Sequence, residues 1–567
     1  MTADILNLND KRLQRLSPVQ LTRELMRLPA KRRMEIILER ADAEAVVAAL
    51  DANDFFFTVQ EIGPDDCLPL LGLARQDQVD HLFDLEWWRK DAVEPAKALI
   101  WLDRLGRAST PKLLEWLYHA DFELLIALFK QWVTVAVAPE DIDLIEARES
   151  LPAHTLDDVY FWESRYPQYD DLIAHLLTLV YEVNYSFFKE LINHVLLAPT
   201  VEIEELAYMF HKSRLMDNAI PDYYDALEIY RAIKPGEIAQ KPSSLPEPGE
   251  HSPPSFALAL VSDSDLLGRV LREVDNPETA EMLQFEMAAL ANKVIVADLL
   301  APDSADSLRG AVEKALAHVN LGLELISGGD TEKAAETVRN VFFEHLFRLA
   351  HAEIGKIRGR LRKVTMYGWV GRCAGGVKCL DGEWFDAAEE LLARTPRLLR
   401  EARAGAFGPP VREDYFRTPR DLARANHLVD VITAAGYLYK ALGANPQTLA
   451  PKLWSEGQVR TTADITLGVM ICTAAARLLT SGKWLVEPLP ASDWPAIFPL
   501  LRPAEMDRAV MDWAHGVMTD QGQRGLASEY LATVLRDYET EMRPFSEQNP
   551  PEPHLVRFFM FEEPGEG

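Results

Sequence analysis

Apolar residues recur at the period of an α-helix along most of the chain, and this pattern constrains the fold more than any other feature. Residues 172–197, LIAHLLTLVYEVNYSFFKELINHVLL, show it clearly. The apolar residues that follow one another by three or four positions are Leu172, Leu176, Leu179, Val183, Phe187, Leu191 and Val195. Such spacing places side chains on one helix face, and we predict one helix here. Alternation with period two is hard to find, so we predict an all-α protein.

The chain of 567 residues is too long for one hydrophobic core, because single cores stop growing at about 250 to 300 residues. The clearest boundary is the proline-rich stretch 233–255, since proline removes backbone donors and favours extended conformations. We predict an N-terminal helical domain over 1–234, a linker over 235–255, a larger C-terminal helical domain over 256–543 and a proline-rich acidic tail over 544–567. The FFMF segment of this tail either packs on the body of the protein or docks on a partner.

Three segments in the first 130 residues align at a constant offset of 45 positions, namely 28–38, 73–83 and 118–128. The alignment pairs Met34 with Val79 and Leu124, and Leu38 with Phe83 and Leu128. Helical solenoids repeat at about 40 to 47 residues. We therefore predict a helical repeat, or superhelical, region at the N-terminus, and an irregular helical bundle remains the open alternative. Either would present surface to a protein partner.

Three tryptophans, Trp87, Trp88 and Trp101, lie around Pro95, which is placed to open a helix after a short turn. Aromatic residues at such a junction usually pack as wedges between helices. A ligand-binding aromatic box is the alternative interpretation.

With 88 Asp and Glu against 59 Lys and Arg, the chain has a formal net charge of −29. Such a surface repels phosphate groups and anionic lipids, so we expect no nucleic-acid partner. The apolar run ITLGVMICTAAA at 465–476 is shorter than the about 20 residues that span a bilayer, so it predicts a buried core helix and no membrane span. The four cysteines show no C-x-x-C spacing, which favours a reducing compartment, and we predict a cytoplasmic protein.

Common catalytic motifs are absent from the sequence, including G-x-x-x-x-G-K-[ST], G-x-S-x-G and H-E-x-x-H. The stretch FFEHLFRLAH at 342–351 places Glu344 and His351 on one helix face, but seven residues separate them by about 10 Å along the axis. Arg348 lies between them and is placed to pair with Glu344 at i,i+4. His345 lies at the edge of the apolar face, where we expect a buried hydrogen bond. This stretch predicts a packed helix and no catalytic pair.

One predicted helix face gathers possible metal ligands. In RQDQVDHLFD at 75–84, a turn of about 100° per residue brings Asp77, Asp80, His81 and Asp84 within one arc. Three carboxylates and an imidazole could hold a hard divalent cation such as Mg²⁺, which prefers oxygen ligands. A solvated acidic face is the alternative. No other cofactor is expected.

Five phrases along the chain carry a family resemblance. They are FDLEWWRKDAVEPAKALIWLDRL at 83–105, RLMDNAIPDYYDALEIYR at 214–231, FEMAALANKVIVAD at 285–298, NLGLELISGGDTEKAAE at 320–336 and LDGEWFDAAEELLARTPRLL at 380–399. Together they resemble an uncharacterised bacterial family of the domain-of-unknown-function class, found in delta-proteobacteria and their relatives. The resemblance covers most of the chain and implies no catalytic residue.

The first 130 residues are also similar to the cytosolic N-terminal helical repeats of bacterial magnesium transporters. That similarity implies a small superhelix with acidic faces that bind divalent ions. Because this chain departs from those proteins by lacking a transmembrane region, transport is not implied.

These features predict a non-enzymatic, cytoplasmic helical protein that binds a protein partner as an adaptor, regulator or assembly component. The alternative is a divalent-cation-responsive sensor, or a metal-dependent hydrolase, that uses the acidic face of residues 77–84.

Overall fold

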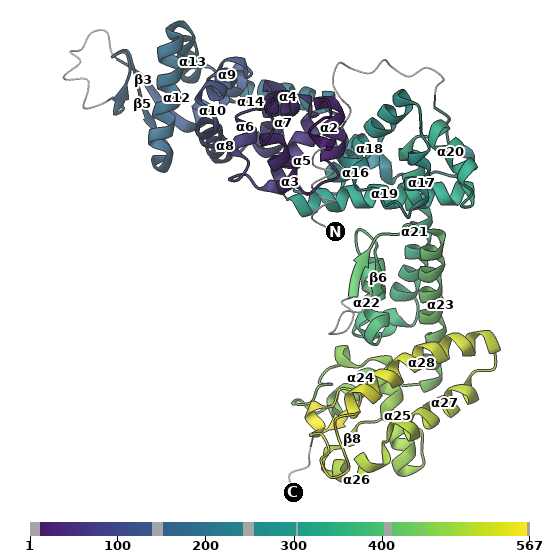
Figure 1. Cartoon of the computed structure of the whole chain (residues 1–567). Coiled ribbons are helices and arrows are strands. Elements are labelled where there is room, and N and C mark those ends of the chain that lie inside the picture. The colour runs from purple at the N-terminus through teal and green to yellow at the C-terminus, as the bar shows by residue number, and fades with distance from the viewer. Residues whose placement is uncertain are drawn as a thin grey trace. The chain divides into compact units, whose positions relative to one another are not determined.

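Figure 1 shows the computed structural model of the chain, which divides into two compact units, Met1–Arg348 (unit 1) and Leu349–Gly567 (unit 2). The structure describes residues 12–138, 151–241, 254–301, 304–401, 411–444 and 446–563. Both units are built mainly from helices, which confirms the all-α prediction. None of the helices in the described ranges combines the length and the apolar character that crossing a bilayer requires.

The first part of unit 1 is a run of short helices. They are α2 (Pro18–Leu25), α3 (Ala30–Leu38), α4 (Ala43–Ala49), α5 (Ala52–Ile62), α6 (Leu68–Leu71), α7 (Gln76–Glu86), α8 (Pro95–Ala108), α9 (Thr110–His119) and α10 (Phe122–Trp132). Local sequence signals set several of their starts, because Ser17, Asp51 and Ser109 each accept a hydrogen bond from a backbone N–H of the helix that follows. Helix α8 begins at Pro95, as predicted.

The three aligned segments of the sequence coincide with α3, α7 and α10. Their residues do not have equivalent environments, however. Leu38 is 41% exposed, whereas the aligned Phe83 and Leu128 are buried. The alignment therefore describes where helices occur, and a regular solenoid stays a prediction.

A small antiparallel sheet follows α10, and the sequence analysis did not predict it. Its strands β3 (Val133–Val137), β4 (His154–Thr155) and β5 (Tyr160–Ser164) have the order β3-β5-β4. Strand β3 has the sequence VTVAV, in which valine and threonine favour extended backbone. A short hairpin, in which β1 (Trp88–Arg89) and β2 (Ala92–Val93) have two residues each, was also not predicted. Helical periodicity elsewhere in the chain obscured these short strands.

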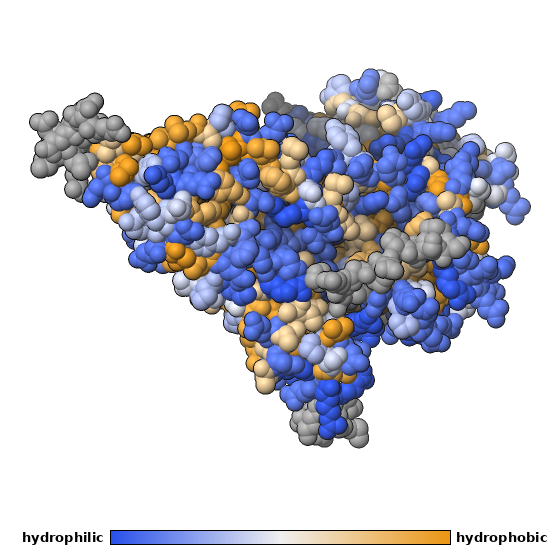
Figure 2. All heavy atoms as spheres, turned by 90° about the horizontal axis from the view of Figure 1, so that it is seen from above, coloured by the Kyte–Doolittle hydropathy of each residue, from blue (hydrophilic) through white to orange (hydrophobic). Residues whose placement is uncertain are grey.

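The helix predicted over 172–197 is two helices, α12 (Asp170–Val183) and α13 (Tyr185–Leu197), so the prediction of one helix is wrong. The break is at Asn184, whose side chain accepts a hydrogen bond from the backbone N–H of Phe187 at 3.1 Å and caps α13. Val183 and Tyr185 at the break are exposed. Figure 2 shows hydrophobic side chains gathered on the face over the end of unit 1 that carries β3, β5, α12 and α13.

Helix α14 (Thr200–Asp217) follows and packs against α10 and α7. On its outer face Val201, Met209 and Met216 are each more than half exposed, and Glu202 and Glu205 are exposed beside them. Exposed apolar side chains with a polar surround are typical of surfaces that bind proteins. The predicted protein partner stays a prediction.

The remaining helices of unit 1 follow α14, and all of them except α15 come after the predicted linker. They are α15 (Tyr223–Ala226), α16 (Phe256–Ala259), α17 (Leu266–Arg272), α18 (Pro277–Ala297), α19 (Ala305–Ser327), α20 (Thr331–Asn340) and the start of α21 (Phe343–Met366). Residues 242–253 of the predicted linker lie outside the described residues.

The division into compact units differs from the predicted division at 235–255. Buried Asp54 of α5 accepts hydrogen bonds from the backbone N–H groups of Ser255 and Phe256 and from the Ser255 hydroxyl, at 2.7 to 2.9 Å. Phe57 and Phe256 stack with ring centroids 3.9 Å apart. These contacts tie the chain after the proline-rich stretch to α5, so both flanks belong to unit 1. The prolines of 233–255 indicate an irregular segment within unit 1. The boundary between the two compact units lies at Arg348, where it is set by the packing of their cores.

Gly322 is the point of close approach between α19 and α21. A β-carbon at this position would overlap the carbonyl oxygen of Leu346, and backbone cannot move aside as a side chain can. We expect Gly322→Ala to lower the free energy of unfolding by about 1 to 3 kcal/mol, measured by urea denaturation.

Gly355→Ala, within α21, is the matched control for this prediction. A β-carbon at Gly355 would meet nothing within 4 Å, so alanine is expected to stabilise the helix by about 0.5 to 1 kcal/mol. Equal effects of the two substitutions would contradict the close approach at Gly322.

Unit 2 contains most of α21 and four further long helices, α22 (Gly382–Leu392), α23 (Pro419–Leu442), α27 (Pro503–Val517) and α28 (Gln521–Met542), around the buried helix α25 (Leu467–Ser481). The burial of α25 confirms that the run 465–476 is a core helix. Asp381 fixes its start, because this buried carboxylate accepts hydrogen bonds from the Gly468 N–H at 2.8 Å and from the Tyr530 hydroxyl at 2.8 Å. Two hairpin strands, β6 (Leu398–Glu401) and β7 (Val411–Asp414), lie between α22 and α23.

The C-terminal FFMF segment packs on unit 2 itself, which decides between its two predicted roles. Strand β9 (Phe561–Glu562) pairs in parallel with β8 (Leu489–Pro490). The side chains of Phe558, Phe559, Met560 and Phe561 are buried. The FFMF segment is therefore part of the core of unit 2 and is not a free docking peptide.

Candidate functional site

The four predicted metal ligands have different environments on α7. Asp77 is exposed and pairs with Arg75 at 2.6 Å. Asp80 accepts hydrogen bonds from Gln76 and from the indole N–H of Trp116, both at 3.0 Å. His81 and Asp84 are buried. Within the described ranges, no group of three or more His, Cys, Asp or Glu side chains could hold a metal ion, so the geometry lends the Mg²⁺ site no support and it stays a prediction.

His81 is a core residue in an apolar environment. Neither of its ring nitrogens has a hydrogen-bond partner among the described residues, and the ring makes an edge-to-face contact with Phe56, with centroids 6.2 Å apart. Burial lowers the pKa of His81 to about 4, because the charged imidazolium would be desolvated. The ring is therefore neutral near pH 7.

Asp84 is the centre of a buried polar network between α7 and α14. Its Oδ1 accepts hydrogen bonds from Nδ1 of His211 at 3.0 Å and from Nη2 of Arg214 at 2.7 Å, and its Oδ2 accepts one from Nε of Arg214 at 2.7 Å. Arg214 also pairs with Asp121. Burial raises the pKa of Asp84, but the hydrogen bonds from Arg214 and His211 outweigh it, so the pKa lies below its ordinary value. Asp84 is thus a carboxylate that fixes the position of His211.

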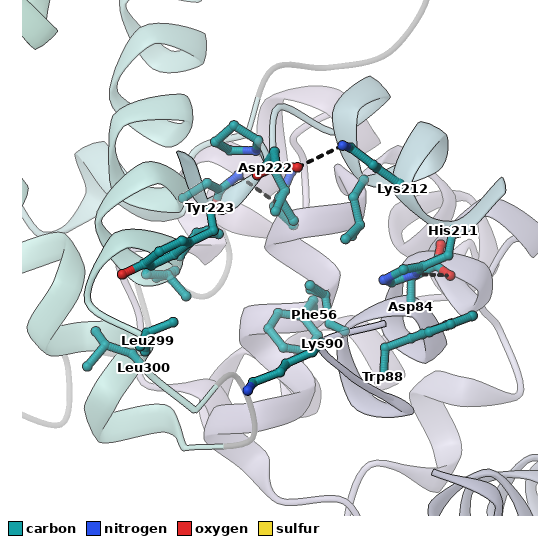
Figure 3. Close-up of a pocket in the computed structure, with 18 of the residues that line it drawn as sticks. Phe56, Asp84, Trp88, Lys90, His211, Lys212, Asp222, Tyr223, Leu299 and Leu300 are labelled. Atoms are coloured by element: carbon teal, nitrogen blue, oxygen red, sulfur yellow. Dashed lines mark hydrogen bonds and ion pairs between the residues drawn. The ribbon is translucent and has the colours of Figure 1, made fainter. Parts of the chain in front are cut away.

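Beside this network lies a cavity of about 850 Å³ within unit 1. It is formed by residues of α5, α7, the β1–β2 hairpin, α14, α15, α18 and α19, and Figure 3 shows its lining. The aromatic lining residues are Phe56, Phe57, Trp88, Tyr208, Tyr223 and Tyr224. The aliphatic ones are Leu85, Leu215, Ile220, Ile295, Val296, Leu299, Leu300 and Leu308. Ligand sites in proteins commonly have this volume range and this mainly apolar lining.

His211 presents a polar atom to the cavity in a fixed orientation. Its ring stacks on the indole of Trp88, with centroids 4.2 Å apart and planes inclined by 12°. Nδ1 is engaged with Asp84, and the other ring nitrogen points away from Asp84 into the open space (Figure 3). With Nδ1 engaged by the Asp84 carboxylate, the inward nitrogen is the ring atom that a bound molecule can reach.

The two lysines that line the cavity differ in their partners. Lys212 donates to Asp222 at 2.7 Å, and this hydrogen bond lowers the pKa of the Asp222 carboxyl. Asp222 also accepts from the backbone N–H of Tyr224 and caps α15. Lys90 has no hydrogen-bond or ion-pair partner among the residues that the structure describes.

Strained backbone concentrates at this cavity. Four described residues other than glycine have positive φ, and two of them, Lys90 at 61° and Leu299 at 55°, line the cavity. A third, Ala219 at 58°, offers its carbonyl to the amide of the buried lining residue Asn292 at 3.4 Å. Such conformations cost free energy and are found preferentially at functional sites. The cavity is therefore our candidate functional site.

A model of a family of unknown function, DUF6178, matches residues 10–562. The chain belongs to the DUF6178 family. Membership confirms the predicted resemblance to an uncharacterised domain family, while the bacterial source and the similarity to magnesium transporters stay predictions. Searches of curated proteins and of solved structures find no match to this chain.

Two residues of the candidate site were already singled out in the sequence. Asp84, a predicted metal ligand, accepts hydrogen bonds from His211 and Arg214. Trp88 lines the cavity, whereas Trp87 and Trp101 are buried and do not line it. His211 carried no local signal, because 127 residues separate it from Asp84.

Residues 342–345 of the stretch FFEHLFRLAH line a smaller hollow in unit 1. Glu344 pairs with Arg348 at 3.8 Å, as predicted, and more closely with Lys293 at 2.6 Å. The buried Nδ1 of His345 has no hydrogen-bond partner among the described residues. The sequence does not reveal the pairing of Glu344 with Lys293, because Lys293 lies on a different helix, α18.

Proposed function

We propose that this protein is a non-enzymatic binding protein whose ligand, an apolar small molecule, occupies the cavity of unit 1. The observation that carries the proposal is a preformed cavity of about 850 Å³ with a mainly aromatic and aliphatic lining. Apolar surface of this extent gains free energy when a ligand displaces its water, at roughly 25 cal/mol per Å². A role as an adaptor or regulator follows if the ligand controls the availability of unit 1 to a partner.

The polar groups at the cavity support binding more than catalysis. His211 is oriented by Asp84 like a general base, but the described lining residues include no serine, threonine or cysteine to serve as its nucleophile. The Asp84 carboxylate is engaged by both Arg214 and His211. The ring nitrogen of His211 that points into the cavity can orient a bound molecule through one hydrogen bond. A turnover activity that is lost in a His211→Ala variant would overturn the proposal.

Binding can be measured with N-phenyl-1-naphthylamine, an uncharged apolar dye whose fluorescence rises in a dry site. We expect saturable binding to the full chain. A double variant, Leu215→Trp with Val296→Trp, fills the cavity from α14 and α18. It is expected to bind the dye about tenfold more weakly, equivalent to about 1.4 kcal/mol.

The matched control places the same side chain on the same two helices outside the cavity. Met209→Trp on α14 and Phe285→Trp on α18 replace exposed apolar residues that do not line it. This pair should bind the dye like the unmodified chain. Equal loss in both double variants, or no saturable binding at all, would contradict the cavity as a binding site.

A further inference from the structure

We propose that the cavity selects an amphiphile with an apolar body and an anionic head group, such as a medium-chain carboxylate, and that Lys90 recognises the head group. This inference rests on the proposed function. The first observation is that Lys90 has a backbone conformation that is unfavourable for lysine.

Lys90 occupies a turn position that favours glycine. Arg89 pairs with Ala92 in the β1–β2 hairpin, so Lys90 and Asp91 form a two-residue loop. Lys90 has a φ of 61°, in the left-handed region where a β-carbon is strained and where such loops usually have Gly, Asn or Asp. Lysine therefore costs stability at this position. Compared with glycine in this loop, lysine adds a long side chain and a positive charge.

The exposed Lys90 side chain extends from the hairpin over the cavity that it lines. Figure 3 shows it between Phe56 and Trp88 on one side and Leu299 and Leu300 on the other. The chain that carries this lysine has a net charge of −29, yet no described carboxylate pairs with its ammonium group. An ammonium has three donors and no acceptor, so its complement is an anion or another strong acceptor.

The other charges at the cavity are largely balanced by partners within the chain. Lys212 pairs with Asp222 at 2.7 Å, and Asp84 is held by Arg214 and His211. Asp91, the other residue of the hairpin loop, also lines the cavity without a described partner and is exposed like Lys90. A ligand cation that meets Asp91 is therefore the competing possibility, and the experiment includes it.

The apolar body of the ligand follows from the apolar wall of the cavity. Phe56, Ile295, Val296 and Leu300 line the cavity with side chains that offer no hydrogen bonds. An alkyl or aryl chain loses nothing by contacting them, whereas a polar chain would lose its hydration without compensation. A charged head beside Lys90 and an apolar chain against this wall satisfy both parts of the lining.

Displacement of bound N-phenyl-1-naphthylamine tests the head group directly. The competitors are octanoate, octyl phosphate, 1-octanol and octylamine, which share one alkyl chain and differ in charge. We expect octanoate to displace the dye from the full chain at a concentration about tenfold lower than 1-octanol or octylamine needs, the ratio expected for one charge-assisted contact of about 1.4 kcal/mol. Displacement by octyl phosphate in place of octanoate would assign the same anion site to a phosphate head.

Variants at the hairpin separate recognition from stability. Lys90→Gly should abolish the advantage of the anions and should also raise the Tm, because glycine relieves the strained turn. Lys90→Arg should keep the advantage, since the charge remains. Arg89→Ala removes a neighbouring exposed cation that does not line the cavity, and it should leave the advantage unchanged.

Two failures can be distinguished. If the dye itself does not bind, the proposed function is wrong. If the dye binds and 1-octanol or octylamine competes as well as the anions, or if the anion advantage survives Lys90→Gly, only the head-group inference is overturned. A fall in Tm for Lys90→Gly would contradict the strain argument on which it stands.

Discussion

Deletion of residues 557–567 from the full chain is expected to unfold unit 2. Phe558, Phe559, Met560 and Phe561 are all buried in this unit. Burial of one such side chain contributes about 1.5 to 3 kcal/mol, so the four together contribute about 6 to 12 kcal/mol. This equals or exceeds the total stability of many domains, which is about 5 to 15 kcal/mol. The deletion should therefore abolish the cooperative unfolding transition of unit 2.

The backbone of the segment adds to this effect. The Met560 N–H donates to Thr473 Oγ1 at 3.1 Å, and the carbonyls of Met560 and Phe561 accept from Leu489 and Trp454, each at 2.8 Å. Without the segment these buried groups lose their partners. Hydrogen exchange of the α25 amides is the measurement, because α25 is the core helix of unit 2. Those amides should exchange freely in the deleted protein.

Single substitutions keep this prediction testable if the truncated chain aggregates. Phe559→Ala, at a side chain that is 1% exposed, should destabilise unit 2 by about 3 to 5 kcal/mol. Leu555→Ala is the control, because Leu555 lies in the same C-terminal tail, just before the deleted residues, and is 59% exposed. Native-like protection of α25 in both the deletion and Phe559→Ala would contradict the packing of the tail.

Asp84→Ala is expected to be the most damaging single substitution at the candidate site. It leaves the His211 ring and the partly buried Arg214 guanidinium without their shared carboxylate. Removal of one partner from a buried ion pair typically costs about 3 to 5 kcal/mol, because the remaining charge is uncompensated. The retained Asp121 offsets part of this cost. The measurement is urea unfolding of the full chain at pH 7, followed through tryptophan fluorescence.

The pH dependence of this effect has a definite sign. The folded-state pKa of Asp84 lies below the ordinary Asp value of 3.8, so the ionised carboxylate stabilises the fold above that value. This contribution is lost as the pH falls through the folded-state pKa. The stability difference between the unmodified chain and Asp84→Ala should therefore be largest near neutral pH and should shrink in acid.

Asp77→Ala is the matched control on the same helix. Asp77 is exposed and forms a surface ion pair with Arg75, so its removal should change stability by less than about 1 kcal/mol. If Asp77→Ala and Asp84→Ala had equal effects, Asp84 could not be the buried anchor of His211.

Helices were predictable where the signal lies within a few residues. Pro95 opens α8, and the uncharged run 465–476 is the buried helix α25, because both features depend on neighbouring positions. Asn184 carried an equally local capping signal, but the apolar stripe continued across it and hid the break between α12 and α13. The short strand β3 was missed for a related reason, since its pairing with β5 is not visible in its own sequence.

The candidate site was predictable only in fragments. The helical arc of Asp77, Asp80, His81 and Asp84 was a reasonable hypothesis for an isolated helix, but packing buried His81 and Asp84 and left Asp77 at the surface. Whether an aspartate becomes a metal ligand or an ion-pair partner depends on what packs against it. Here that partner is α14, which brings Arg214 and His211 to Asp84.

The sequence by itself determined the helical class, the helix starts at capping residues and prolines, the acidic surface and the membership of a family. These properties depend on composition or on residues within one or two helical turns. Tertiary structure alone decided the division at Arg348, the packing of the FFMF segment and the cavity around His211 and Lys90. These features depend on contacts between segments that are tens to hundreds of residues apart. Which side chains such contacts bury is determined only when the chain packs.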